Sequence, residues 1–254
     1  MHIEGAAYAS VIAQFLMALL SAYYLLKKTD IPLLISFPFN KEIKRFLIMI
    51  GNLIIRTLAL NVTLYFATRY ATSYGAEYIA AYTIAINLWF LGAFLIDGYA
   101  SAGNILSGKL LGGKEYSKLI TLSNKLIKFG VIVGLIIAVI GAVMYYPIGH
   151  VFTKDPQVLK QFYNVFWIVL VMQPLCALAF IFDGMFKGLG KMKDLRNLLI
   201  FSTFLVFLPL LYFFDQNNLK LTGIFIALTF WILARGLPLI IKFRKEFLPL
   251  SQKN

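Results

Sequence analysis

Among the charged residues inside the apolar stretches of this 254-residue sequence, three stand out, because each charge at that depth needs a partner. Arg56 is near the middle of one stretch, Asp97 is well inside the next, and Asp183 ends a later one. A charge at the centre of a membrane helix costs about 2.5–3.5 kcal/mol on insertion scales, so each of these residues invites a functional explanation. In a cavity such groups pass protons or hold cations. Asp97, Arg56 and Asp183 are therefore the candidates for ion coupling.

Arg56 and Asp97 lie on consecutive stretches that are joined by a short turn around Tyr74. Arg56 is 18 residues before Tyr74 and Asp97 is 23 residues after it, which gives an axial difference of about 7–8 Å at 1.5 Å per residue. A long arginine side chain covers most of that difference, so the two charges can pair. Such a pair either faces a cavity and joins a proton relay, or serves only to let both residues insert.

Asp183 precedes Gly184 and is followed by Lys187 one helical turn later. The i,i+4 spacing favours a local ion pair, so we expect Asp183 to mark the end of its helix. A cation-binding role is the alternative. Arg235 lies near the inner end of the last apolar stretch, and we expect it to extend to the membrane surface as an anchor.

Amide and indole side chains within the stretches can line a polar cavity or hold neighbouring helices together. The cavity-lining candidates are Asn61, Asn87, Trp89 and Gln173. Asn61 follows Arg56 by five residues, so the two side chains point about 140° apart on an ideal helix and need not share a surface.

The composition decides the class of protein around these residues. Hydrophobic residues make up 60% of the chain and charged residues 14%, whereas an ordinary soluble domain has roughly 45–50% and about 25%. Seven apolar stretches are long enough to cross a bilayer as helices, at 5–26, 46–68, 78–106, 126–148, 160–184, 197–214 and 222–241. The sequence therefore predicts an all-α polytopic membrane protein with about seven transmembrane helices.

Lysine and arginine alternate between the connections, with 17 on one side of the predicted membrane and 3 on the other. Because basic loops stay in the cytoplasm, we predict an inner or plasma membrane protein whose first residue is outside and whose carboxyl terminus is cytoplasmic. The net charge of +13 then comes from the basic residues of the cytoplasmic loops, and no nucleic-acid partner is expected. An outside start without a cleavable leader leads us to expect further helices upstream.

A weak internal repeat suggests how the helices are grouped. Residues 3–9 (IEGAAYA) resemble residues 221–227 (LTGIFIA), and each segment opens a stretch that runs from outside to inside and ends in basic residues. Repeats of this kind are typical of transporters built from two related lobes. We therefore predict that residues 1–39 hold the last helix of a preceding lobe and a cytoplasmic linker, and that residues 40–254 form one complete six-helix lobe.

Five short motifs carry a resemblance to a known family. In order they are GAAYA at 5–9, RTLAL at 56–60, LIDGYA at 95–100, SGKLLG at 107–112 and FDGMFKGLG at 182–190. Their order and spacing resemble the multidrug and toxic compound extrusion (MATE) transporters, in particular the DinF-like branch. The resemblance implies twelve helices in two lobes around a central cavity, of which this sequence covers the sixth to the twelfth. In DinF-like members the coupling acid lies on the first helix of the amino-terminal lobe, outside this sequence.

The resemblance implies efflux of amphipathic or cationic drugs and toxins in exchange for H⁺ or Na⁺, with no other cofactor. It also implies that this chain alone is an incomplete transporter. The partners would be membrane lipid, small amphipathic substrates and the missing amino-terminal lobe, on the same or a separate chain. A lipid-linked saccharide flippase of the same superfamily is one alternative, and a strongly cationic cavity would favour it. A seven-helix receptor and a non-transporting remnant are the others.

The sequence gives no support for an enzyme, since it has neither a Walker loop nor paired helical histidines. Its two histidines, His2 and His150, fall near the predicted outer surface, and the single cysteine, Cys176, lies in an apolar run. No metal site is predicted from these residues.

Overall fold

The structure, a computed structural model, describes residues 3–28 and 42–252. The chain forms two compact units, Met1–Arg45 and Phe46–Asn254. The first contains α1 (Ile3–Lys28), an apolar helix that ends in Lys27 and Lys28. The predicted boundary between residues 39 and 40 lies outside the described residues.

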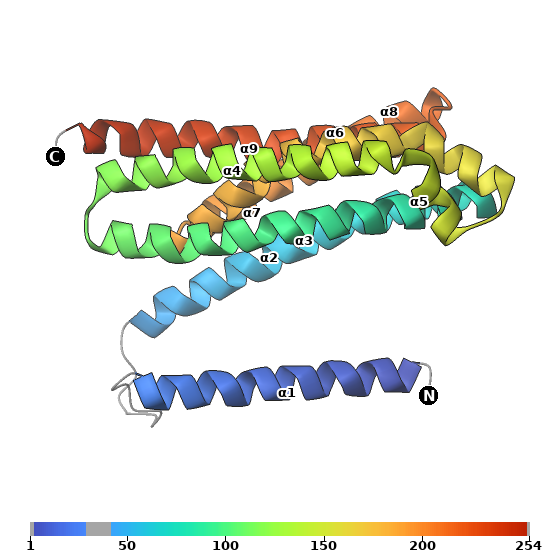
Figure 1. The fold of residues 1–254 in the computed structure, drawn as a ribbon. Helices are drawn as coiled ribbons and strands as arrows, with labels where there is room; N and C mark the ends of the chain where they lie inside the picture. Colours follow the sequence, from blue (N-terminus) through green and yellow to red (C-terminus); the bar gives the residue numbers. More distant parts are fainter. Residues whose placement is uncertain (1–2, 29–41, 253–254) are drawn as a thin grey trace. The chain divides into compact units, whose positions relative to one another are not determined.

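The second unit holds the remaining helices, and Figure 1 shows them running alongside one another. They are α2 (Glu42–Ser73, which starts just before the unit), α3 (Ala76–Gly112), α4 (Tyr116–Val143), α5 (Tyr145–Phe152), α6 (Pro156–Gly188), α7 (Met192–Phe201), the π-helix η1 (Ser202–Phe207), α8 (Leu208–Gln216) and α9 (Lys220–Ser251). No strand occurs within residues 3–28 and 42–252. Seven helical segments are long and apolar enough to span a membrane, which confirms the predicted fold class.

The fourth predicted stretch, 126–148, has the wrong bounds. Helix α4 begins ten residues earlier, at Tyr116, and residues 145–152 form the separate short helix α5. Leu119 and Ser123 are buried at the same helical spacing as Leu126 and Gly130, so the inward face of α4 continues past the end of the apolar stretch. Hydropathy detects the lipid-facing part of a helix, and it misses an amphipathic extension.

The sixth span changes its helix type partway along. Helix α7, the π-helix η1 and helix α8 follow one another without a break from Met192 to Gln216. Pro209 lies in the first turn of α8, and it has no amide hydrogen to donate to the preceding turn. A wider turn just before a proline is a recognised way to accommodate that missing bond.

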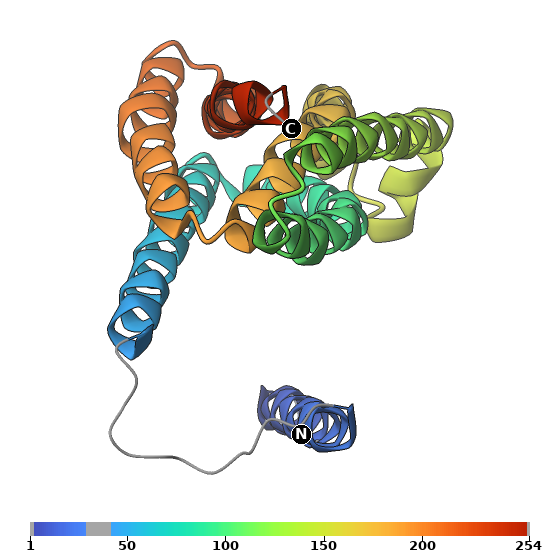
Figure 2. The same ribbon diagram turned by 90° about the vertical axis from the view of Figure 1, so that its left-hand side faces the viewer.

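Helix α6 is the centre of this unit. Of the residues in its most apolar window 61% are buried, compared with 17% in α2. It packs against α3, α4 and α9, while the span from α7 to α8, drawn in orange in Figure 2, lies beside α2 and α9. A Cβ atom on Gly184 would overlap the carbonyl oxygen of Ala100, so α3 and α6 approach backbone to backbone.

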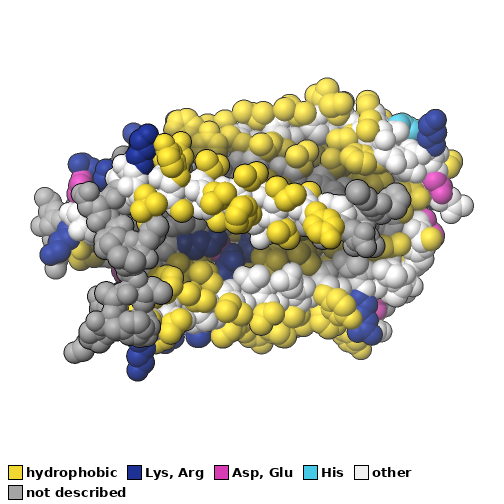
Figure 3. Space-filling model, turned by 90° about the horizontal axis from the view of Figure 1, so that it is seen from below, with side chains coloured by type: hydrophobic (Ala, Val, Ile, Leu, Met, Phe, Trp, Pro, Cys, Tyr) yellow, Lys and Arg dark blue, Asp and Glu magenta, His cyan; other side chains and the backbone are white. Residues whose placement is uncertain are grey.

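The surface fits a lipid environment. Large apolar side chains are exposed on every long helix, and Figure 3 shows mostly hydrophobic side chains along the helices, with most of the visible charged ones near helix ends. Since lipid tails solvate apolar side chains and water solvates charges, this distribution is that of an integral, multi-pass membrane protein.

Candidate functional site

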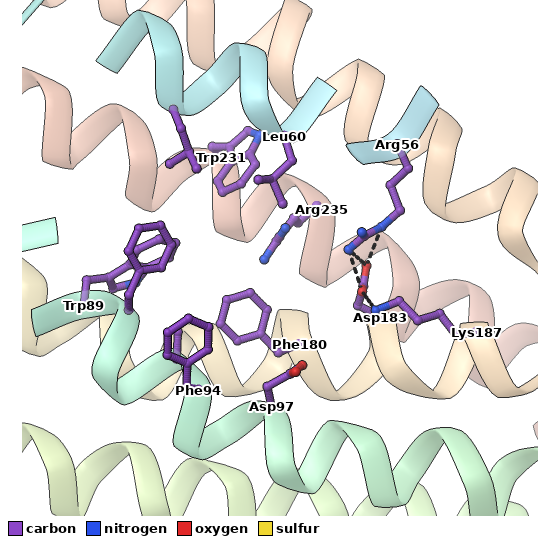
Figure 4. Close-up of a pocket in the computed structure, with 13 residues that line it drawn as sticks. Arg56, Leu60, Trp89, Phe94, Asp97, Phe180, Asp183, Lys187, Trp231 and Arg235 are labelled. Carbon is purple, nitrogen blue, oxygen red and sulfur yellow. Dashed lines mark hydrogen bonds and ion pairs between the residues drawn. The ribbon is translucent and has the colours of Figure 1, made fainter. Parts of the chain in front are cut away.

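A pocket of about 180 Å³ lies where α2, α3, α6 and α9 meet. Aromatic and charged side chains share its wall, and Figure 4 shows them pointing towards one another. The lining residues are Arg56, Leu60, Leu64, Trp89, Phe90, Ala93, Phe94, Asp97, Phe180, Asp183, Lys187, Trp231 and Arg235. The pocket therefore contains all three residues that the sequence suggested for ion coupling.

The carboxylate of Asp183 is bound by two basic side chains. Arg56 donates from Nη2 to both carboxylate oxygens, at 2.6 and 2.7 Å, and from Nε at 3.2 Å. Lys187 Nζ lies 2.9 Å from Oδ2, which confirms the predicted i,i+4 pair. The side chains of Arg56 and Asp183 are only 12% and 11% exposed. A two-pronged arginine–carboxylate contact with so little solvent fixes the geometry of both groups.

The pairing of Arg56 with Asp97 is wrong. Arg56 binds Asp183 instead, and Asp97 has no ion-pair partner within residues 3–28 and 42–252. Counting from the turn at Tyr74 gives only the height of each residue along its helix. The rotation of α2 about its own axis turns Arg56 towards α6, where Asp183 lies 127 residues later in the sequence. Asp97 still lines the pocket, with its carboxylate exposed.

The expectation that Arg235 anchors α9 at the membrane surface is also wrong. The residue is 3% exposed, and its guanidinium carbon lies 4.5 Å from the ring centre of Trp231 and 4.8 Å from that of Phe180. Helix α9 runs 16 residues beyond Arg235, to Ser251, which is about 24 Å at 1.5 Å per residue. The apolar stretch ends at residue 241, and this misleadingly places Arg235 close to the end of the helix.

The helical spacing of the charged and aromatic residues indicates this arrangement, although hydropathy alone does not. Trp231 and Arg235 are spaced i,i+4 on α9, which places a cation over the preceding aromatic face. Phe180, Asp183 and Lys187 are spaced by three and four residues, so one face of α6 presents all of them.

Of the four cavity-lining candidates, Trp89 lines this pocket, and its Nε1 donates to Cys176 Sγ at 3.0 Å. Asn61 and Asn87 are exposed, and each donates to the carbonyl four residues earlier in its own helix. Gln173 is 2% exposed and lines a second, mainly apolar pocket of about 200 Å³ between α3, α4, α5 and α6. A single sequence does not show which side of a helix faces the cavity, so three of the four candidates lie elsewhere.

A buried hydrogen-bond network lies behind the aromatic wall. Trp231 Nε1 donates to Thr203 Oγ1 at 3.2 Å, and Thr203 shares a hydrogen bond of 2.9 Å with Thr63 Oγ1 of α2. Thr203 also lies 3.3 Å from the carbonyl oxygen of Ala59. The network joins α9, η1 and α2, and it fixes the Trp231 ring that forms one side of the pocket.

Tyr74, in the turn between α2 and α3, is held by a charge on another helix. Its hydroxyl donates to Asp215 Oδ1 at 2.5 Å, and the rings of Tyr70 and Tyr78 pack against it edge to face. Burial, together with the hydrogen bond to Asp215 and the negative charge of that carboxylate, raises the pKa of Tyr74 above its ordinary value near 10.

This raised pKa predicts a loss of stability at high pH. A group with a raised folded pKa contributes its full stabilisation below the unfolded pKa, about 10, and loses it as the pH rises through the folded value. We expect the advantage of the wild type over Tyr74→Phe to be constant up to about pH 10 and to shrink above it. Detergent-solubilised unfolding between pH 8 and pH 11.5, followed by circular dichroism, measures the two curves. Parallel curves would show that Tyr74 does not titrate with folding.

No group of three or more histidine, cysteine, aspartate or glutamate side chains suited to a metal occurs in the described part of the chain. In the pocket, Arg56 and Lys187 pair with Asp183, Arg235 lies against aromatic rings, and Asp97 makes no ion pair in the described residues. The arrangement suits the binding of an amphipathic organic molecule, with rings for its apolar body and charges for its polar end.

The family model named MatE matches residues 49–213, from α2 to α8. The chain is 28% identical over 252 residues to Protein DETOXIFICATION 45, chloroplastic, of Arabidopsis thaliana, covering 96% of this chain and 42% of that protein. It is 26% identical over 257 residues to DNA damage-inducible protein F of Escherichia coli, covering 97% and 54%. The chain therefore spans about half the length of these relatives.

Solved structures show the same fold. An outward-facing multidrug resistance MATE family transporter of the MOP superfamily superposes with a TM-score of 0.85 and 22% identity, over 98% of this chain and 57% of that one. A MOP superfamily transporter from Pyrococcus furiosus, described as having a binding pocket of reversed polarity, gives 0.84 and 22%, over 97% and 57%. The family match covers most of the chain and agrees with the fold, and the chain belongs to the MatE family of membrane transporters.

Proposed function

We propose that this chain is the carboxyl-terminal part of an ion-coupled exporter of amphipathic organic molecules. The observation that carries the proposal is the pocket at the meeting of α2, α3, α6 and α9, in a chain of a transporter family. Aromatic rings and five ionisable side chains converge there. Such a wall accepts an apolar body and a polar end together.

The five ionisable side chains have different tasks in this proposal. Asp183 is engaged by Arg56 and Lys187, so its charge is held in place and it orients the pocket. Asp97 is exposed to the pocket and makes no ion pair within residues 42–252. A carboxylate without a fixed partner is the better group to take up and release H⁺ or Na⁺, which is the coupling ion we propose.

The further helices of the exporter would come from the same or a separate chain, since the relatives are about twice as long. We propose the orientation that the basic loops favour, with residue 1 outside and the carboxyl terminus cytoplasmic. Membership of a transporter family favours export over the seven-helix receptor, and flux measurements separate an exporter from a non-transporting remnant.

The proposal is tested in proteoliposomes that carry an imposed H⁺ or Na⁺ gradient. Gradient-dependent movement of a fluorescent amphipathic molecule supports export. The probes are the cation ethidium and an anion, 7-methoxycoumarin-4-acetate, used first with this chain alone and then with the protein isolated from its own membrane. If this chain is one half of the exporter, flux should appear only with the longer form of the protein or with a partner chain. Absence of gradient-dependent flux in both preparations would contradict the proposal.

One observation favours a second candidate, a lipid-linked saccharide flippase of the same superfamily. The pocket has three basic side chains, Arg56, Lys187 and Arg235, against two acidic ones. A net positive wall suits a phosphate-bearing lipid better than a cationic drug. Gradient-independent flipping of a fluorescent lipid diphosphate, with no ethidium export, would favour the flippase.

Substitution of Asp97 tests the proposed coupling role. We expect Asp97→Asn to reduce gradient-driven export at least tenfold, because the amide cannot exchange an ion. The free energy of unfolding should change by less than about 0.5 kcal/mol, because the carboxylate has no partner to lose. Asp97→Glu is the control, and it should keep measurable coupling. Export by Asp97→Asn with an unchanged pH dependence, at normal abundance, would remove Asp97 from the mechanism.

A further inference from the structure

We propose that the guanidinium of Arg235 is the binding site for an anionic group, a carboxylate, on the amphipathic substrate. The inference rests on the proposed function, which supplies the substrate, and it narrows the substrate class from amphipathic organic molecules in general to those with an acidic end. It requires Arg235 to be buried, unpaired and directed into the pocket.

All three conditions hold in the structure. Arg235 is 3% exposed, and Figure 4 shows its guanidinium pointing into the space between α2, α3 and α6. Its Nε and Nη1 atoms have no hydrogen-bond partner in the described part of the chain. Trp231 and Phe180 lie against the guanidinium and accept no conventional hydrogen bond from it. A buried guanidinium with unpartnered N–H donors pairs well with a carboxylate, whose oxygens accept charge-assisted hydrogen bonds.

Neither neighbouring acid makes a hydrogen bond or a close ion pair with Arg235 in the described residues, although the charge of Asp183 acts on it from a longer distance. Asp183 already receives three hydrogen bonds from Arg56 and an ion pair from Lys187. Asp97 lines the same pocket, but it forms no ion pair with Arg235 within residues 42–252. Buried charges in proteins are paired or bound to a ligand, because an isolated one is costly. A ligand anion is the partner that this pocket can receive.

The rest of the wall indicates what carries the anion. Trp89, Phe90 and Phe94 of α3 form a run of aromatic rings, and Phe90 and Phe94 stack with their ring centres 6.1 Å apart. The volume of about 180 Å³ is smaller than the roughly 300–1,000 Å³ of sites for drug-sized ligands. The pocket therefore takes the acidic end of a molecule and one adjoining ring system.

Tryptophan fluorescence gives a direct binding assay. The chain has three tryptophans; Trp89 and Trp231 line the pocket, while Trp167 is 51% exposed elsewhere. In a Trp167→Phe background, energy transfer from the other two to a coumarin reports occupancy. The probes are 7-methoxycoumarin-4-acetate, its acetamide and the 4-(2-aminoethyl) analogue, which share the ring and differ in charge. The protein is held in phosphatidylcholine nanodiscs.

We expect the carboxylate to bind roughly 10- to 100-fold more tightly than the amide, the range of a charge-assisted hydrogen-bonded pair. The ammonium probe should bind most weakly. Arg235→Gln should bring the carboxylate and the amide to equal affinity, and Arg235→Lys should keep part of the preference. Arg244→Gln, an exposed arginine on the same helix, should keep all of it.

If the protein that retains Arg235 binds the carboxylate and the amide equally, the proposal is overturned. This comparison does not depend on whether a variant of the pocket folds. An anionic lipid headgroup is another source of the same chemistry. If phosphatidylglycerol in the nanodiscs abolishes the preference, the guanidinium site stands and its occupant is a lipid phosphate. Because the assay measures binding without flux, a carboxylate preference together with failed export would count against the proposed function alone.

Discussion

Asp183→Asn is expected to lower the free energy of unfolding by about 3–5 kcal/mol, the cost of removing one partner of a buried ion pair. The amide leaves Arg56 and Lys187 facing each other without the charge that now separates them. It also gives Arg56 only one accepting oxygen in place of two. Titration of the purified chain from mild detergent into sodium dodecyl sulfate, followed by circular dichroism, measures the effect.

Asp97→Asn is the matched control for this experiment. It is the same chemical change in the same pocket, at a carboxylate with no ion-pair partner in the described residues. Its expected effect on unfolding is below about 0.5 kcal/mol. Combining Asp183→Asn with Arg56→Gln should recover part of the loss, because the double variant no longer buries an unpaired arginine. Equal effects of the two asparagine variants would show that the ion pair contributes little to the fold.

The second large effect is expected from Gly184→Ala. The added Cβ would meet the carbonyl oxygen and carbon of Ala100, which are backbone atoms and cannot rotate away. Helices α3 and α6 must then separate, and this is the most extensive helix contact in the unit. Forcing extra volume into a packed core costs about 1–3 kcal/mol, and we expect the upper end of that range.

Gly98→Ala provides the opposite result on the partner helix. Gly98 follows Asp97 as Gly184 follows Asp183, yet a Cβ there has no atom within 4 Å. Replacing glycine by alanine at an open helical position stabilises by roughly 0.5–1 kcal/mol. Opposite signs for the two variants, in the same unfolding assay, would identify the backbone contact as the cause. A loss of stability in both would point to a general intolerance of alanine in these helices.

The number of spans could be predicted because it depends only on runs of apolar residues, and the seven stretches correspond to seven helices. The Asp183–Lys187 pair could be predicted because the geometry of one helix fixes it. The partner of Arg56 could not. In a helix that is apolar on all sides, periodicity gives no rotation, so nothing in the sequence tells whether Arg56 faces α3 or α6.

Arg235 illustrates the other source of error, which is depth. The end of an apolar stretch marks where a helix leaves the lipid or meets a polar segment, and α9 continues well beyond that point. The π-helix η1 has no hydropathy signal either, although Pro209 indicates where the α-helical hydrogen bonds are interrupted. The residues of the candidate site were thus predicted only in part, since Arg56, Asp97, Asp183 and Trp89 line the pocket and Asn61, Asn87 and Gln173 do not. The pairing of the charges depended on packing between helices.

Trp231 takes part in two contacts with different parts of one rigid ring. Its face lies against Arg235, and its N–H edge is bonded to Thr203 in η1. An indole has no torsion within the ring, so any change of rotamer that moves the face also withdraws the edge. A change of the Trp231 rotamer would therefore alter the pocket wall and the hydrogen bond to η1 together. The wall of the pocket and the contact between α9 and η1 thus share a single side chain.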